Sequence, residues 1–69
     1  MTILDQETIS WHAVTDELPD IDITVLVCCP TDAEPVWLGW YDNGWFTVDA
    51  QEYEPDAVTA WAAMPRGPA

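Results

Sequence analysis

The apolar residues of the chain fall into short runs, and each run is followed by Pro, Gly or Asp. This spacing is typical of β-strands separated by turns. It predicts five strands, at residues 10–14, 24–29, 36–41, 45–48 and 58–64. The second run, TVLVCC, is continuously β-branched and apolar, which predicts the most buried strand of a sheet.

The stretch VWLGWYDNGWF contains an Asn-Gly pair between two strand-like runs, which is the strongest short-range signal for a β-hairpin. A two-residue turn places Tyr41 opposite Phe46, and a three-residue loop shifts the pairing by one. Both faces of the hairpin are apolar in either register. We expect one face to form the core and the other to be covered by the N-terminal segment or another part of the chain. The alternative is that the second face contacts a protein partner, with Trp37 and Tyr41 as its aromatic contacts.

Helical signals are weak, because Pro, Gly and β-branched residues interrupt every longer window. Two short candidates are residues 3–9 and one turn at residues 16–18, where Thr15 is a candidate N-cap. The sequence therefore predicts a single mainly β domain over residues 1–69. Its expected architecture is a small antiparallel meander of about five strands with one short helix or helical turn, and residues 65–69 are expected to fray.

Charge changes this picture, because 13 acidic residues stand against one Arg and no Lys, giving a formal net charge of −12. A hydrophobic fraction of 49% is too high for a disordered acidic tail. The shortage of basic residues excludes direct nucleic-acid binding, which depends on Lys and Arg contacts to phosphate. A net charge of this size on a small surface is self-repulsive and lowers the stability of the fold, which indicates that the charge serves a function.

The candidate catalytic and metal-binding residues are few. Cys28 and Cys29 are adjacent, so on a strand they point to opposite faces and are expected to be free thiols. His12 shares a strand face with Ser10, but no nucleophile elbow accompanies them, and an aromatic packing role beside Trp11 is expected. No calcium-loop or zinc spacing is present. We therefore expect no enzymatic activity, no cofactor and no metal.

The location in the cell is predicted from what the sequence lacks. No apolar run approaches the 18 to 20 residues of a spanning helix, and MTILDQET resembles no signal peptide. A cytoplasmic protein without membrane contact is expected.

Four segments, WHAVTDELP, TVLVCC, WLGWYDNGW and AVTAW with its Pro-containing tail, together resemble a small phage and prophage domain family of unknown function. The resemblance covers about residues 11–68, and it implies a compact β-rich fold in a mobile-element context without implying an activity. Ala60 stands where that family usually has His, so no role of that His transfers. The residues 21–23 replace a usual Gly-containing turn.

In an up-and-down meander, successive connections alternate between the two ends of the sheet. One end is then expected to collect Asp16, Glu17, Asp20, Asp22 and Asp42. The other is expected to collect Asp32, Glu34, Asp49, Glu52, Glu54 and Asp56. Two acidic ends about 17 to 20 Å apart could imitate the phosphates of about half a turn of DNA.

The leading hypothesis is therefore an inhibitor that imitates DNA and occupies the basic groove of a DNA-binding protein. The phage resemblance, and a similarity in size and charge to acidic anti-CRISPR proteins, point to a host defence complex, either a CRISPR effector subunit or a restriction enzyme. A monomer is expected rather than a dimer. The alternative is an aromatic protein-interaction or homodimer module whose acidity reflects halophilic or solubility pressure.

Overall fold

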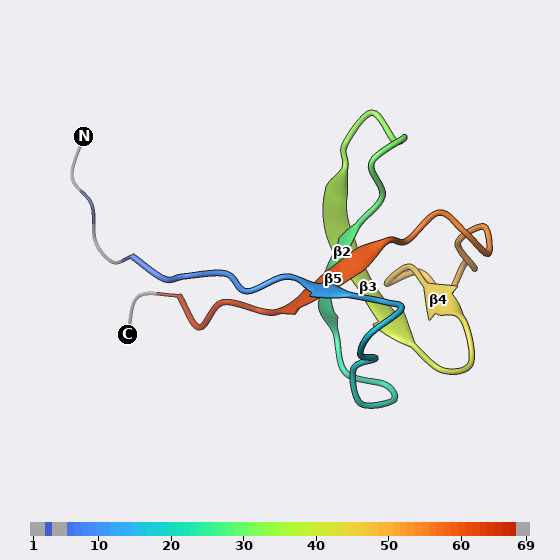
Figure 1. Cartoon of the computed structure of the whole chain (residues 1–69), viewed down its shortest axis with the longest axis horizontal. Coiled ribbons are helices and arrows are strands. Elements are labelled where there is room, and N and C mark those ends of the chain that lie inside the picture. The colour runs from blue at the N-terminus through green and yellow to red at the C-terminus, as the bar shows by residue number, and fades with distance from the viewer. Residues whose placement is uncertain (1–2, 4–5, 68–69) are drawn as a thin grey trace.

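The computed structural model describes residue 3 and residues 6–67, and in these residues it contains one antiparallel five-stranded sheet and no helix (Figure 1). The strands are β1 (His12–Ala13), β2 (Val25–Cys28), β3 (Val36–Tyr41), β4 (Trp45–Phe46) and β5 (Ala60–Ala63). The predicted mainly β, antiparallel fold is confirmed. The predicted helix at residues 3–9 does not form where the chain is described, and residues 4–5 lie outside the described part.

The strand order is β1-β5-β2-β3-β4, so the meander holds only for β2, β3 and β4. β5 lies between β1 and β2, and Trp61 is opposite both His12 and Val27. The sequence AWAA is uncharged and apolar throughout, which suits a strand flanked on both sides. Because β1 and β2 are both antiparallel to β5, they run in the same direction. The connection at residues 14–24 must therefore pass from one end of the sheet to the other.

A hydrogen-bonded turn at residues 13–17 stands in place of the helical turn predicted at residues 16–18. The carbonyl oxygen of Ala13 accepts hydrogen bonds from the backbone N–H groups of Asp16 at 3.0 Å and Glu17 at 3.1 Å. The turn therefore follows β1 directly, and the Ala13 carbonyl opens it instead of a Thr15 cap.

The hairpin adopts the three-residue loop, the second of the two registers considered above. Tyr41 is opposite Trp45, Trp40 is opposite Phe46, and Asn43 takes the left-handed φ of 56°. This register separates the aromatic residues between the two faces of the sheet. The rings of Trp40 and Phe46 stack at 4.5 Å on one face, whereas Trp45 enters the core on the other.

The core lies on one face of the sheet, called here the core face. Its buried residues are Val25, Val27, Cys29, Trp45, Val58 and Trp61. The predicted burial of the second strand is confirmed, since Val25 and Val27 of β2 are 2% and 0% exposed. Val14 and Tyr53 pack against this cluster from the connections that follow β1 and β4. The two long connections therefore cover the core face.

Gly39 lies where β4 and the following connection approach β3 most closely. A Cβ at this position would lie 2.9 Å from the carbonyl oxygen of Phe46, 3.1 Å from Cγ1 of Val27 and 3.4 Å from the ring of Tyr53. The hydroxyl of Tyr53 donates a hydrogen bond to the carbonyl of Leu38 at 3.2 Å. Glycine at position 39 thus allows the β4 end of the sheet to bend over the core.

The opposite face of the sheet, called here the open face, follows from the same register. Its residues are Ala13, Leu26, Cys28, Val36, Leu38, Trp40, Phe46, Ala60 and Ala62. It includes no acidic or basic residue.

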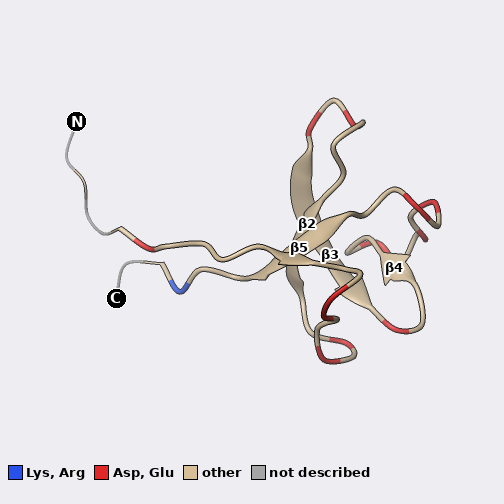
Figure 2. Ribbon diagram, in the orientation of Figure 1, with Lys and Arg blue, Asp and Glu red and all other residues tan. Residues whose placement is uncertain are grey.

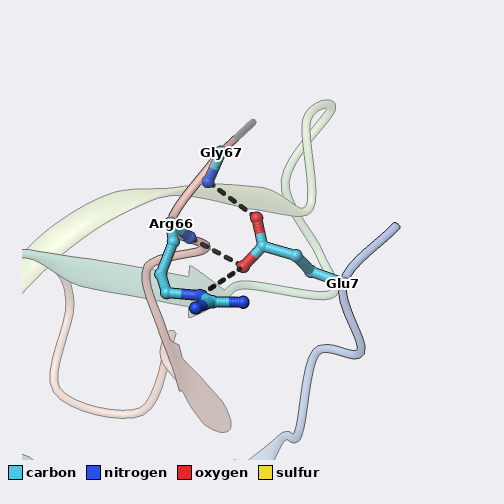
Figure 3. A network of polar contacts seen from close by, with 3 residues as sticks. All are labelled: Glu7, Arg66 and Gly67. Atoms are coloured by element: carbon cyan, nitrogen blue, oxygen red, sulfur yellow. Dashed lines mark hydrogen bonds and ion pairs between the residues drawn. The ribbon is translucent and has the colours of Figure 1, made fainter. Parts of the chain in front are cut away.

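Residues 6–11 and 64–67 run side by side away from the sheet and form an extended arm (Figure 1). The carboxylate of Glu7 accepts hydrogen bonds from the backbone N–H groups of Arg66 at 2.8 Å and Gly67 at 2.6 Å, and it lies 3.7 Å from Nε of Arg66 (Figure 3). The described part of the predicted frayed tail is therefore held by Glu7, and residues 68–69 lie outside the described part.

Candidate functional site: an acidic rim

The carboxylates predicted to contact a partner all lie in the connections around the sheet and are all exposed (Figure 2). None belongs to strands β1 to β5. This set is called here the acidic rim. Its members are Asp16, Glu17, Asp20, Asp22, Asp32, Glu34, Asp42, Asp49, Glu52, Glu54 and Asp56.

Three rim residues gather beside the hairpin loop, at the turn end of the rim. The backbone N–H of Asp22 donates to the carbonyl of Tyr41 at 3.2 Å, immediately before Asp42. Glu52 forms a bridge with Phe46, and its Oε2 lies 2.9 Å from the position that a Cβ on Gly44 would take. The turn end therefore consists of Asp22, Asp42 and Glu52.

The placement of Glu52 corrects the grouping expected from a meander, which put this residue at the other end of the sheet. After β4 the chain reverses, and the backbone N–H of Tyr53 donates to the carbonyl of Trp45 at 2.8 Å. Residues 52 and 53 thus lie alongside β4, and the reversal returns Glu52 to the hairpin loop.

A second group lies at the opposite end of β3, at the hollow end of the rim. Asp32 and Glu34 border a shallow hollow together with Trp37, Thr47 and Tyr53. The backbone N–H of Asp49 donates to the hydroxyl of Thr47 at 3.2 Å. This end is defined by Asp32, Glu34 and Asp49.

Asp16 and Glu17 lie apart from both groups, at the turn that follows β1. The carbonyl of Glu17 accepts a hydrogen bond from Nε1 of Trp61 at 2.9 Å, and its carboxylate lies 3.7 Å from Nδ1 of His12. The two residues are therefore tied to the β1–β5 side of the core face. No described contact joins them to Asp42, with which the meander had grouped them.

The rim lacks basic partners. The chain's one Arg, Arg66, lies on the arm and is paired with Glu7. Among the described residues, His12 is the other basic side chain close to a carboxylate, and its Nδ1 lies 3.7 Å from Oε1 of Glu17. The negative charge of the two ends is therefore not offset by any Lys or Arg of the chain.

The two aromatic residues predicted as secondary contacts both lie on the core face. Tyr41 packs against the core, with its ring edge-on to Trp45 at 5.1 Å. Trp37 is 53% exposed and borders the hollow next to Asp32 and Glu34. The structure thus makes Tyr41 a packing residue and leaves Trp37 accessible beside the acids.

The remaining residues with reactive side chains are His12, Cys28 and Cys29, and each lies on a strand or directly after one, packed against neighbouring residues. His12 is half-buried and its ring lies 4.6 Å from that of Trp61, so its aromatic partner is Trp61, on the neighbouring strand. Cys28 lies half-exposed on the open face, and Cys29 is buried in the core. Within the described residues, no group of His, Cys, Asp and Glu side chains is arranged to hold a metal ion.

Two core groups have perturbed ionisation. Burial, followed by the negative charge of Asp32, raises the pKa of the Cys29 thiol above its ordinary value of 9.0. Burial, followed by Cys29 and Asp32, raises the pKa of Tyr53 above 10.0. Both groups are neutral in the folded chain at neutral pH.

These shifts predict a loss of stability at alkaline pH. The Cys29 thiol loses its proton at a lower pH in the unfolded chain than in the folded chain. Its contribution to the free energy of unfolding is therefore complete below about pH 9, and it is lost as the pH rises through the higher pKa of the folded chain. We expect the urea midpoint, followed by tryptophan fluorescence, to fall above about pH 9. Cys29→Ala should reduce this fall, whereas the neighbouring Cys28→Ala should retain it. Equal pH profiles for the two variants would show that Cys29 does not contribute.

Together, the sheet and the rim define a small, single-sheet, all-β acidic protein in which the charged side chains of the described residues lie in the connections, at His12 of β1 and on the arm. No family model matches the chain, and no curated protein or solved structure is significantly similar to it. Among the residues described, no helix has the length and apolar character needed to cross a membrane. The structure therefore assigns the fold, and the function is argued below from the rim.

Proposed function

We propose that this protein inhibits a DNA-binding defence complex of a host cell by imitating DNA. The acidic rim occupies the basic surface with which that complex reads DNA. The observation that carries the proposal is the separation of charge from the sheet: the strands contain no acidic residue, and exposed carboxylates without basic partners lie at both ends of β3.

The dimensions of the sheet support imitation of a duplex. β3 has six residues, which span about 20 Å at about 3.4 Å per residue. Duplex DNA carries one phosphate charge per about 1.7 Å, and a full turn measures about 34 Å. The turn end and the hollow end are therefore separated by about half a turn of DNA. A folded sheet holds them at this distance without an ordering penalty on binding.

The amount of charge also supports a role beyond solubility. A net charge of about 2 to 8 in magnitude is sufficient for a small soluble domain, whereas this chain has −12. The resemblance to a phage domain family supports a host defence target, namely a CRISPR effector subunit or a restriction enzyme. On this proposal the protein acts in the host cytoplasm, binds no nucleic acid itself and catalyses no reaction.

The test uses two triple variants that each remove charge from one end. The turn-end variant combines Asp22→Asn, Asp42→Asn and Glu52→Gln, and the hollow-end variant combines Asp32→Asn, Glu34→Gln and Asp49→Asn. Each is titrated into purified CRISPR effectors and restriction endonucleases with labelled duplex DNA. For a complex inhibited by the parent chain, we expect each variant to inhibit about tenfold or more weakly.

A charge-conserving control separates charge from side-chain shape. The variant Asp22→Glu, Asp42→Glu and Glu52→Asp keeps all three negative charges and should inhibit nearly as well as the parent. The amide variants should fold with equal or higher stability, because they relieve repulsion. Full inhibition by both amide variants would refute DNA mimicry.

A protein-interaction module is the second candidate, with acidity that reflects halophilic or solubility pressure. The open face is the observation that favours it, because this face is apolar and its described residues, apart from the buried Ala62, are exposed or half-buried. A halophilic origin predicts that the chain folds only at high salt, whereas a DNA mimic folds at physiological salt. An unfolding curve at the two salt concentrations distinguishes these cases.

A further inference from the structure

The open face has less cover than the core face, since Ala62 of β5 is the one residue on it that is buried in the described part of the chain. Val14, Tyr53 and Val58, which come from the two long connections, all pack on the core face. On the open face, Val36 is 43% exposed, and Leu26, Leu38, Trp40 and Phe46 are only half-buried. Large contiguous apolar surfaces of this kind are rare on monomers and typically mark interfaces.

The arm continues the open face beyond the sheet. Trp11 and Ile9 lie two and four residues before Ala13, so strand alternation places them on the same side. Met64 is two residues after Ala62 and follows the same rule. All three are between 42% and 44% exposed. Two extended segments that pack on nothing else are marginally stable in water, so the arm also calls for a partner.

The exposed area matches what a dimer of ordinary size would bury. The chain exposes 5237 Å², whereas a monomer of 7.7 kDa exposes about 4,300 Å² by the usual scaling with mass. The excess is about 900 Å², and a standard interface buries about 800 Å² on each partner.

The two halves of the open face are complementary in shape. The β3–β4 half contains the stacked rings of Trp40 and Phe46 and forms an aromatic ridge. The β1–β5 half contains the exposed Ala13 and the half-buried Ala60, which form an alanine floor beside the fully buried Ala62. In a two-fold dimer, the same surface of both copies forms the interface, so the β3–β4 half of one open face meets the β1–β5 half of the other. The ridge of each copy can therefore sit on the floor of the other.

The charge distribution permits this arrangement. Two chains of −12 repel each other wherever rim residues meet, but the strand positions of the open face contain none of the rim, and Asp22 reaches only the edge of the face, where it lines a hollow with Trp40. Face-to-face packing keeps the rest of both rims on the outside. A basic partner protein would gain little electrostatic contact on this face, so the face suits a second copy of the chain better than the rim's proposed target.

We propose that two copies of this chain associate through their open faces, each aromatic ridge packed on the alanine floor of the other. The dimer leaves two acidic rims accessible, so this inference extends the proposed function and does not depend on it. It differs from the monomer expected from the sequence, which assumed that the N-terminal segment or another part of the chain covers the second apolar face.

The primary test is the mass of the full chain by sedimentation equilibrium over a range of concentrations. We expect twice 7.7 kDa at high concentration. Dimerisation should be stronger at about 500 mM salt than at about 50 mM, because salt screens the repulsion between rims without weakening apolar contacts. DNA mimicry predicts the opposite salt response for partner binding, so the two proposals can fail independently. A mass of one chain under all conditions would overturn the dimer.

Two substitutions on the open face provide a matched comparison. Val36→Glu and Ala60→Glu each place an unpaired carboxylate in the interface and should weaken dimerisation about a hundredfold. Ile21→Glu adds the same charge at an exposed loop residue and should have a much smaller effect. Folding of each variant is checked by tryptophan fluorescence. A dimer that persists in both open-face variants would overturn this interface.

Cys28 offers a test on the unaltered chain. It is half-exposed on the open face in a single copy, whereas Cys29 is buried in the core. We expect alkylation of Cys28 to slow as the protein concentration is raised through the dimerisation range. An alkylation rate that is independent of concentration would overturn the proposal even if every variant failed to fold.

Discussion

Replacement of Trp61 by alanine is expected to abolish folding. Trp61 is 8% exposed on β5, its ring packs at 4.6 Å from that of His12, and its Nε1 donates to the carbonyl of Glu17 at 2.9 Å. Truncation of a buried aromatic residue to alanine costs about 3–5 kcal/mol. A domain of 69 residues has a total stability of about 3–10 kcal/mol, so the loss removes most or all of it.

The measurement is urea unfolding, followed by tryptophan fluorescence and circular dichroism. Trp37→Ala is the matched control, because it removes the same side chain from a position that is 53% exposed. Trp37→Ala should fold, with a change in the free energy of unfolding of about 1 kcal/mol or less. If Trp61→Ala were as stable as Trp37→Ala, the core described here would be incorrect.

Gly39→Val is expected to destabilise the chain by about 2–3 kcal/mol or more, although valine favours strands and glycine does not. The first added atom would lie 2.9 Å from the backbone carbonyl of Phe46, which cannot move without displacing β4. Gly39→Ala should show the same sign with a smaller effect, since it adds only that atom.

Gly44→Ala is the control for the effect of removing a glycine. Its added Cβ also meets an atom at 2.9 Å, but that atom is the carboxylate oxygen of Glu52, at the free end of a flexible side chain. This variant should therefore have nearly the stability of the parent in the same urea titration. An increase in stability for Gly39→Val would contradict the close approach of β4 to β3.

Local features of the fold were predictable where strong turn residues lie on both sides of a strand. β3 begins and ends at the predicted residues because Pro35 and the Asp-Asn-Gly loop delimit it. The insertion of β5 between β1 and β2 was not predictable, since it depends on pairing between residues more than thirty positions apart in the chain, such as Val27 and Trp61. Long-range pairing leaves no local pattern in a sequence.

The exposure of the acidic residues followed from their position between apolar runs, but their grouping did not. Glu52 reaches the hairpin loop only because residues 52–53 fold back along β4. The alternative of a partner-contacting second face named Trp37 and Tyr41, which lie on the core face, for a related reason. Residues 36–41 are apolar at every position, so alternation shows two apolar faces without showing which one the connections cover.

DNA mimicry is decided by a competition titration of the parent chain at two salt concentrations. The chain displaces labelled duplex DNA from an inhibited defence complex, and the concentration for half-displacement is measured relative to that of unlabelled duplex. If the acidic rim binds the DNA-reading surface, displacement at about 500 mM salt should be about tenfold or more weaker than at about 50 mM, in parallel with the duplex competitor. Displacement of equal strength at both salt concentrations would contradict a rim that acts through its charge.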